Sequence, residues 1–494
     1  GKAMGGEPLL PAASEPSATA RERGYARLTD AQKSAPHRSN VAGRAFLLGC
    51  AALALLLVVL ALLARLAAWN RRDVVAEAWM ERHTPLYGVN VGGWLVLEKW
   101  LCGTTSLRTK CCGEVASPYS AAAAGDSEDE FSLTARLRAA DELDAIDAFR
   151  SARVSSVDFE AMASAGVTAV RVPFPWWVAR EPAPPGSEAW REGAGGYHVG
   201  RGIELLDQVV SNAERHSLSL LLELHAAPGG QSGRQTTGRS DPTWEPSRFD
   251  ADGALSALRL VATRYNSSRS VVAISPLNEP ELSNEVLLPY YQRAYETVRG
   301  SGMRAGQVAF VLQLYGLGAI FSLGWAALDS PEGLPAARYP NIIFDLHLYY
   351  GVLVPPFPAL FDRLASPHFV AGPLVHLESM LLDVGSRPAL TGEWSLRTPY
   401  ATDDQSALPR RFDAQSDGEH NATMRALGRA QLGAHYGASS IFARLLGGRT
   451  RRAGAFFWTW GGAPHGEEEF WSFEVAIERG WLPPVRMWGS PPNR

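Results

Sequence analysis

The chain has 494 residues, of which 46% are hydrophobic and 20% are charged, and its formal net charge is -4. These proportions are typical of a globular protein and exclude a largely disordered or fibrous chain. The near balance of acidic and basic residues also argues against nucleic-acid binding, which normally requires a clustered basic excess.

The first feature along the chain is an uncharged apolar run of 19 residues, from Phe46 to Ala64. As a helix it would span about 28 Å, close to the roughly 30 Å hydrocarbon core of a bilayer. A cleaved signal peptide has a shorter apolar stretch and a short basic leader. Here the run follows a segment rich in Ala, Ser, Pro and Arg without an apolar period. We therefore predict a disordered cytoplasmic tail over 1–45, a single transmembrane signal anchor over 46–68 and a stalk over 69–84.

The orientation of this anchor depends on other signals, because basic residues flank the apolar run on both sides. Two tripeptides, Asn266-Ser-Ser and Asn421-Ala-Thr, are glycosylation acceptors if the C-terminal part lies outside the cytosol. They favour a single-pass type II membrane protein that contacts the lipid bilayer through one helix. The folded part would then be extracellular or lumenal.

Three of the four cysteines, Cys102, Cys111 and Cys112, cluster beyond the apolar run. A zinc site would need a fourth nearby Cys or His, and the sequence has none there. In an oxidising compartment Cys102 would pair with either Cys111 or Cys112, which leaves one thiol over.

Beyond residue 85 short apolar runs alternate with longer amphipathic segments, and eight of the runs predict strands. The predicted strands are Leu86–Val96, Thr168–Phe174, Leu218–His225, Val271–Asn278, Val308–Tyr315, Asn341–Tyr349, Pro388–Trp394 and Gly454–Trp460. The predicted helices include Gly202–His216, Ala254–Tyr265, Leu287–Arg299 and Asn421–Leu446. Apolar strands separated by helices imply a parallel sheet covered on both faces. An open doubly wound sheet is the alternative, but no Gly-x-Gly-x-x-Gly turn follows the first strand. We therefore predict an α/β fold, a (β/α)8 TIM barrel over 85–494.

Polar and aromatic side chains interrupt the apolar runs at the C-terminal ends of the predicted strands, where barrel enzymes gather their catalytic groups. These residues are Arg171, His225, Asn278, Glu279, His347, Tyr349, Glu393 and Trp458. Any one of them could be a structural residue with a buried partner. Several at the same end of a barrel indicate a site.

The two glutamates are the sharpest part of this pattern. Glu279 follows the fourth predicted strand and Glu393 ends the seventh, so the two lie on opposite walls of a barrel. Glycoside hydrolysis needs such a pair, because one carboxyl must protonate the leaving oxygen while the other attacks the anomeric carbon. Aromatic side chains could stack on a sugar ring, with Trp458, Trp176 and Trp177 as candidates.

Seven motifs in the same order resemble glycoside hydrolase family 5, and most closely its fungal-type exo-1,3-β-glucanases, from about Pro85 to the end of the chain. The motifs are Gly88-Val-Asn-Val-Gly-Gly-Trp-Leu-Val-Leu-Glu98, Arg171-Val-Pro173, Leu224-His-Ala-Ala-Pro-Gly229, Leu277-Asn-Glu-Pro280, His347-Leu-Tyr349, Gly392-Glu-Trp394 and Phe457-Trp-Thr-Trp460. The resemblance implies that Glu279 is the acid/base and Glu393 the nucleophile of a retaining β-glucosidase. Its substrate would be 1,3-β-glucan or a related β-glucoside, and its catalytic domain would be monomeric without cofactor or metal. The implied substrate-binding residues are Glu98, in the terminal glucose pocket, with Arg171, His225, Asn278, His347, Tyr349 and Trp458.

Two departures from the family pattern fall on the side of the leaving group. Arg234 and Val352 stand where the family usually has aromatics that clasp the sugar beyond the cleaved bond. The linkage and the aglycone therefore stay open. Transglycosylation is an alternative that the sequence does not separate from hydrolysis. An inactive carbohydrate-binding ectodomain would be favoured by loss of a glutamate, and both are present.

Overall fold

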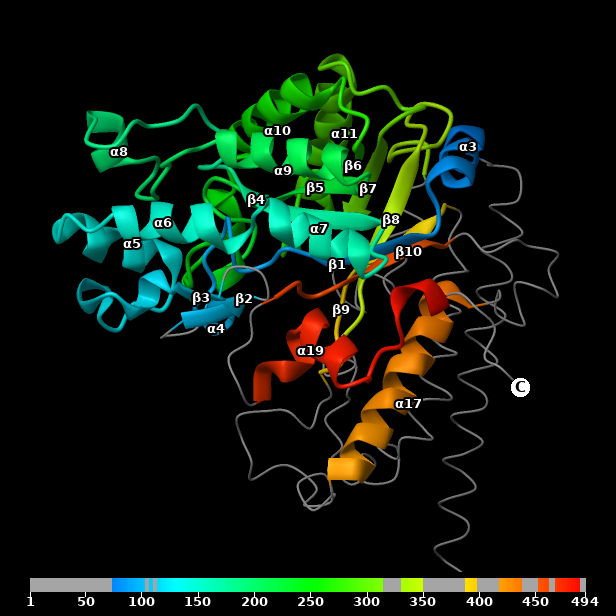
Figure 1. Ribbon diagram of the computed structural model, residues 1–494. Coiled ribbons are helices and arrows are strands. Elements are labelled where there is room, and N and C mark those ends of the chain that lie inside the picture. Colours follow the sequence, from blue (N-terminus) through cyan, green and yellow to red (C-terminus); the bar gives the residue numbers. More distant parts are fainter. Residues whose placement is uncertain are drawn as a thin grey trace, which may run out of the picture. The chain divides into compact units, whose positions relative to one another are not determined.

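The computed structural model describes residues 73–102, 106–109, 113–313, 330–349, 387–397, 417–437, 452–461 and 467–488. Eight parallel strands close into a barrel in the order β1-β4-β5-β6-β7-β8-β9-β10, because β1 pairs with both β4 and β10 (Figure 1). The strands are β1 (Leu86–Asn90), β4 (Ala169–Pro175), β5 (Ser219–Ala226), β6 (Val271–Ser275), β7 (Ala309–Gln313), β8 (Ile342–His347), β9 (Ala389–Trp394) and β10 (Arg452–Phe457). The predicted eight-stranded parallel barrel is confirmed.

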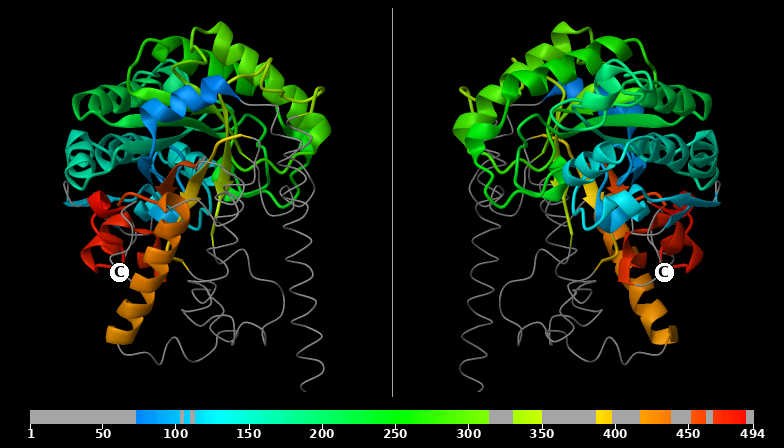
Figure 2. Two further views of the ribbon diagram at one scale, coloured as in Figure 1. Left: turned by 90° about the vertical axis from the view of Figure 1, so that its right-hand side faces the viewer. Right: turned by 90° about the vertical axis from the view of Figure 1, so that its left-hand side faces the viewer.

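The helices that follow the strands lie outside the barrel (Figure 1). They include α7 (Ser156–Ser164), α9 (Glu204–Arg215), α10 (Ala251–Tyr265), α11 (Asn284–Gly300) and α17 (Asp417–Tyr436). In α9 the buried residues recur at helical spacing, from Leu205 to Ala213, so that one apolar stripe faces the strands. Helix α17, orange in both views of Figure 2, packs against β10.

Several elements are additions to the simple alternation of strands and helices. They are the hairpin β2 (Ser106–Thr109) and β3 (Gly113–Ala116), and the helices α4 (Lys99–Cys102), α5 (Glu130–Ala139), α6 (Asp144–Arg153), α8 (Glu188–Glu192) and α19 (Phe473–Glu478). Short 3-10 helices occupy Pro118–Ser120, Ala122–Ala124, Gln235–Thr237, Pro246–Arg248, Glu467–Trp471 and Val485–Met487. Helices α5, α6 and α7 all lie between β1 and β4 in the chain.

Four strands are shorter at their C-terminal ends than we predicted, among them β8, which stops at His347 and not at Tyr349. Strand β1 stops at Asn90, and residues 91–98 continue as a buried irregular loop in which Gly93 has a φ of 58°. Strand β6 stops before Pro276, whose ring nitrogen has no hydrogen to donate to a neighbouring strand. Strand β10 stops at Phe457. The residues beyond these ends form the loops that carry polar groups.

Helix α3 (Val74–His83) lies against the N-terminal ends of the strands. Its Trp79 is fully buried, and the indole Nε1 donates a hydrogen bond of 3.0 Å to the carbonyl of Val272. Asp73, which caps the helix, accepts a bond of 2.7 Å from the Asn341 amide and pairs with Arg387. The segment predicted as a stalk over 69–84 therefore contains, from Asp73, a helix packed on the barrel.

Some predictions concern residues outside the described ranges. These are the tail over 1–45, the anchor over 46–68, the end of the predicted helix beyond Gly437, and the pairing of Cys102 with Cys111 or Cys112. In the part of the chain that the structure describes, no helix has both the length and the apolar composition that a bilayer span requires.

Candidate active site

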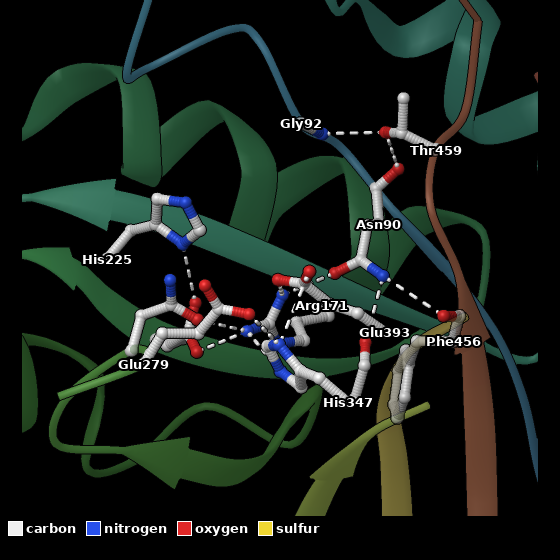
Figure 3. A network of polar contacts seen from close by, with 12 residues as sticks. Asn90, Gly92, Arg171, His225, Glu279, His347, Glu393, Phe456 and Thr459 are labelled. Atoms are coloured by element: carbon white, nitrogen blue, oxygen red, sulfur yellow. Dashed lines mark hydrogen bonds and ion pairs between the residues drawn. The ribbon is translucent and has the colours of Figure 1, made fainter. Parts of the chain in front are cut away.

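The structure brings the nine predicted site residues to the C-terminal end of the barrel, where Figure 3 shows the polar network that several of them form. Arg171, His225, His347 and Glu393 belong to strands β4, β5, β8 and β9, whereas Glu98, Asn278, Glu279, Tyr349 and Trp458 lie in the segments that follow strands. Residues more than 200 positions apart in the chain therefore meet in one cluster.

Glu393 receives a hydrogen bond on each carboxylate oxygen. Arg171 Nη1 donates to Oε1 at 2.8 Å, and the Tyr349 hydroxyl donates to Oε2 at 2.7 Å. Burial alone would lower the pKa of Arg171, but Glu223 and Glu393 outweigh it and raise that pKa. Burial and the charge of Glu393 raise the pKa of Tyr349. Both neighbours therefore keep their protons at neutral pH and can donate to the Glu393 carboxylate.

His347 lies between the two glutamates. Its Nδ1 is 2.8 Å from Glu279 Oε1 and 3.3 Å from Glu393 Oε2, and the three side chains have ligand atoms within 4.8 Å of one another. Burial would lower the pKa of His347, but the carboxylates of Glu393 and Asp345 outweigh it and raise that pKa to about 10. Burial would raise the pKa of Glu279, and the hydrogen bond and charge of His347 lower it. In the free protein the shared proton therefore lies on the imidazole.

The backbone at Glu279 is unusual, with a φ of 39°. For a residue with a Cβ, the left-handed region costs roughly 1 to 2 kcal/mol, so neighbouring contacts must hold it. The Glu279 amide donates to Gln313 Oε1 at 2.5 Å, and the Gln231 side chain donates to the Asn278 carbonyl at 2.9 Å. These bonds fix the direction in which the Glu279 side chain leaves the loop.

Three residues of the network escaped the sequence analysis. Glu223 is fully buried in β5 and binds both Arg171 and His225 Nδ1, the latter at 2.9 Å. Asp345 in β8 accepts the Gly392 amide at 2.6 Å. Asn90 accepts a bond of 2.7 Å from Arg171. A carboxyl group inside an otherwise apolar strand is costly unless it is paired, and that signal was present in both β5 and β8.

The wall formed by Glu98, His225 and Trp458 has unused hydrogen-bonding capacity. Glu98 is 1% exposed, and its Oε2 accepts a bond of 3.0 Å from the indole of Trp100. Within the described ranges, Glu98 Oε1 and His225 Nε2 are buried without a hydrogen-bond partner. Burial raises the pKa of Glu98 to about 7, although the charge of His225 opposes the shift. Trp458 stacks on His225 with ring centroids 5.8 Å apart.

The two further aromatic candidates, Trp176 and Trp177, differ from each other in burial. Trp177 is fully buried, stacks on Tyr197 with centroids 3.8 Å apart and donates from Nε1 to Glu130 at 2.9 Å. It is a core residue, and its interpretation as a sugar platform is wrong. Trp176 is only partly buried, and Arg180 lies over its ring at 5.3 Å.

On the predicted leaving-group side, Arg234 Nε pairs with Glu281 Oε1 at 2.7 Å. The charge of this guanidinium also contributes to the low pKa of Glu279, after the larger effects of burial and the histidines. Arg234 thus lies on the Glu279 side of the carboxylate pair. Val352 lies outside the described residues.

Comparisons with known proteins agree with this geometry. A family model described as cellulase, glycosyl hydrolase family 5, matches residues 148–407. "Probable glucan 1,3-beta-glucosidase A" of Aspergillus fumigatus is 28% identical over 320 residues, which cover 62% of this chain and 64% of that protein. The match thus spans less than two thirds of that relative's length. The protein of the same name from Aspergillus clavatus is 27% identical over 80% of this chain and 86% of its own length.

Two solved structures share the fold. The structure titled "Crystal structure of AoRut" has a TM-score of 0.55 and 20% identity, and the match covers 81% of this chain and 97% of that one. Rutinosidase from Aspergillus niger has a TM-score of 0.51 and 16% identity, with 80% and 96% covered. With the family model spanning half of the sequence, the chain belongs to glycosyl hydrolase family 5.

Proposed function

We propose that the protein is a retaining β-glucosidase that hydrolyses 1,3-β-glucan or related β-glucosides through a covalent glycosyl-enzyme intermediate. The observation that carries this proposal is the proximity of Glu279 and Glu393, which have carboxylate oxygens within 4.8 Å of each other. Retaining enzymes hold their two carboxyls about 5 to 5.5 Å apart, whereas inverting enzymes need about 6.5 to 9.5 Å to admit a water. The names of the relatives support the choice of a 1,3-β-glucan.

Glu393 is the nucleophile in this proposal. Arg171 and Tyr349 hold its two oxygens in fixed directions before the attack. As a bond forms between Glu393 and the anomeric carbon, the carboxylate loses its negative charge. The leaving oxygen gains negative charge at the same moment and needs a proton.

Glu279 supplies that proton, with His347 as its source. The charge of Glu393 is the largest influence that raises the pKa of His347, and it disappears when Glu393 attacks. The pKa of His347 then falls, and its Nδ1 proton can pass over 2.8 Å to Glu279 and on to the leaving group. In the second step Glu279 takes a proton from the water that hydrolyses the intermediate.

Glu98, His225 and Trp458 would hold the glucose unit. The free Oε1 of Glu98 and the free Nε2 of His225 are partners for sugar hydroxyls. Trp458 offers an aromatic face, although it is only 3% exposed and packs on His225. On the other side of the cleaved bond, Arg234 pairs with Glu281 at a position where the family usually has an aromatic side chain. We therefore expect no strict selectivity for a glucose unit as the leaving group.

The experiment that tests these roles uses Glu279→Ala and Glu393→Ala with azide and an aryl β-glucoside whose leaving group needs no protonation. Glu279→Ala should still form the glycosyl-enzyme, and azide should release it as the β-glycosyl azide. Glu393→Ala should be inactive, and any azide rescue should give the α-product. Formation of the β-glycosyl azide by Glu393→Ala would show that Glu279 is the nucleophile and Glu393 the acid/base. A first-formed product of inverted configuration from the unaltered enzyme would refute the retaining mechanism.

Chromatography of products from laminaribiose separates hydrolysis from transfer to sugar. Glucose alone supports hydrolysis, whereas oligosaccharides longer than the substrate support transglycosylation. If neither forms while the protein binds the sugar, an inactive carbohydrate-binding domain is the better description.

We also propose that the enzyme is anchored as a type II membrane protein with the barrel outside the cytosol. The apolar run from Phe46 to Ala64 and the two glycosylation acceptors support this arrangement. Protease added to sealed vesicles whose lumenal face points outward should remove the barrel and spare the tail. Removal of the tail alone would overturn the proposal.

A further inference from the structure

The loop over 91–98 is buried but is neither helix nor strand. Its backbone polar groups therefore need partners from elsewhere in the protein. Two of these partners are charged side chains: the Leu97 amide donates to Glu130 Oε2 at 2.7 Å, and the Leu95 carbonyl accepts from Arg150 Nη2 at 2.9 Å. A pair of side chains from outside the barrel thus holds the loop that ends in the pocket carboxylate.

Glu130 and Arg150 form a buried ion pair with 2.5 Å between Oε1 and Nη2, and their side chains are 0% and 1% exposed. Glu130 begins α5 and Arg150 lies in α6. Apolar residues of similar volume often stabilise such an interface as well as a buried ion pair does. Apolar residues could not reproduce the hydrogen bonds of the pair. Two of these bonds, to Leu95 and Leu97, hold the loop, and two others join Glu130 to Trp177 and Arg150 to the carbonyl of His198.

We propose that Glu130 and Arg150 are positioning residues that aim the Glu98 carboxylate into the sugar pocket without touching the substrate. Leu97 directly precedes Glu98, so a displaced Leu97 peptide displaces Glu98 as well. Among the described residues, one side chain, that of Trp100, holds Oε2 of Glu98 and none holds Oε1, so the direction of Oε1 depends on the backbone. The inference rests on the proposed function of the pocket in binding glucose.

A second buried pair in the same fold provides a matched control. Asp73 pairs with Arg387 at 3.3 Å, with side chains 3% and 2% exposed, and also accepts a backbone amide, that of Asn341. This pair lies at the opposite end of the barrel. Glu130→Gln and Asp73→Asn each remove one buried charge and keep the side chain's shape.

Both variants should lower the melting temperature, because each removes a negative charge that pairs with a buried arginine. Only Glu130→Gln should raise the KM for an aryl β-glucoside, by about tenfold, while kcat changes less. The dissociation constant of a glucose-shaped iminosugar, measured by calorimetry, should rise by a similar factor. An equal rise of KM in Asp73→Asn would overturn the proposal, because a general destabilisation of the fold would then explain the KM of both variants.

A double-mutant cycle tests whether Glu130 acts through Glu98. In a Glu98→Ala background, Glu130→Gln should cause no further loss of iminosugar affinity, whereas an undiminished loss would refute the inference. If Glu130→Gln does not fold, Tyr119→Phe provides the same cycle, because the Tyr119 hydroxyl donates to the Leu97 carbonyl at 3.0 Å. If the unaltered protein neither hydrolyses β-glucosides nor binds the iminosugar, the proposed function fails. If the unaltered protein binds the iminosugar but the losses of affinity in Glu98→Ala and Glu130→Gln simply add, the positioning role is refuted and the proposed function stands.

Discussion

Glu98 should make the free enzyme less stable as pH rises, and Glu98→Gln should remove this effect. Burial raises the pKa of Glu98 from its ordinary value of 4.5 to about 7. Between these values the folded protein keeps a proton that the unfolded chain has lost, so the free energy of unfolding falls as pH rises through this range. A shift of about 2.5 pKa units corresponds to about 3 kcal/mol.

The assay is urea unfolding of both proteins at pH 4 and pH 8. At pH 4 the carboxyl is mostly protonated in both states, and the glutamine variant should match the unaltered protein closely. At pH 8 the variant should be more stable by about 3 kcal/mol, because it buries no charge. The difference between the two proteins isolates Glu98 from the other groups that titrate. A difference that does not change with pH would refute the reasoning.

The same variant should bind sugar less well. A sugar hydroxyl bonded to the free Oε1 of an ionised Glu98 would contribute roughly 1.5 to 3 kcal/mol. The variant should therefore show a raised KM for an aryl β-glucoside at pH 8, with a smaller difference at pH 5, where Glu98 is protonated. A variant that is more stable and binds sugar less tightly would show that the buried charge of Glu98 destabilises the fold and serves sugar binding.

Two further predictions concern other parts of the chain. Trp79→Ala should lower the free energy of unfolding, measured in urea, by about 3 to 5 kcal/mol, because it leaves a cavity at a fully buried position. The KM should not change. A raised KM would mean that α3 influences the pocket. Phe at both positions 234 and 352 should lower the KM for laminaribiose by restoring stacking of roughly 0.5 to 1.5 kcal/mol per contact. An unchanged or higher KM in the folded double variant would contradict the assignment of this side to the leaving group.

The sequence predicted all eight barrel strands because each strand is a short apolar run bounded by polar or turn-forming residues. The errors lie at strand ends. The first predicted strand continued to Val96, but β1 stops at Asn90. The loop that follows is apolar because it is buried against α5 and α6, and it has no strand structure. The Gly92–Gly93 pair marked this break. Apolar composition reports burial, and it distinguishes a strand from a buried loop only with such signals.

The sequence predicted nine residues that the structure brings together at the C-terminal end of the barrel, and it missed the buried groups that hold them. Glu223 and Asp345 lie inside strands that otherwise look apolar, and their partners come from other strands. Trp177 shows the opposite error: it was considered for sugar stacking, but Tyr197 and Glu130 occupy it in the core. Which partner a polar or aromatic side chain finds depends on contacts between distant segments, and no local pattern records them.

The roles of the two glutamates show why this matters for mechanism. Glu279 and Glu393 have the same side chain, and both lie near the C-terminal end of an apolar strand, so their own chemistry does not divide acid from nucleophile. Their neighbours differ: Arg171 and Tyr349 donate to Glu393, whereas Oε1 of Glu279 lies 2.8 Å from Nδ1 of His347. Because His347 lies within 3.3 Å of both glutamates, the charge on one controls the proton available to the other. The asymmetry that catalysis needs is therefore a property of the whole network.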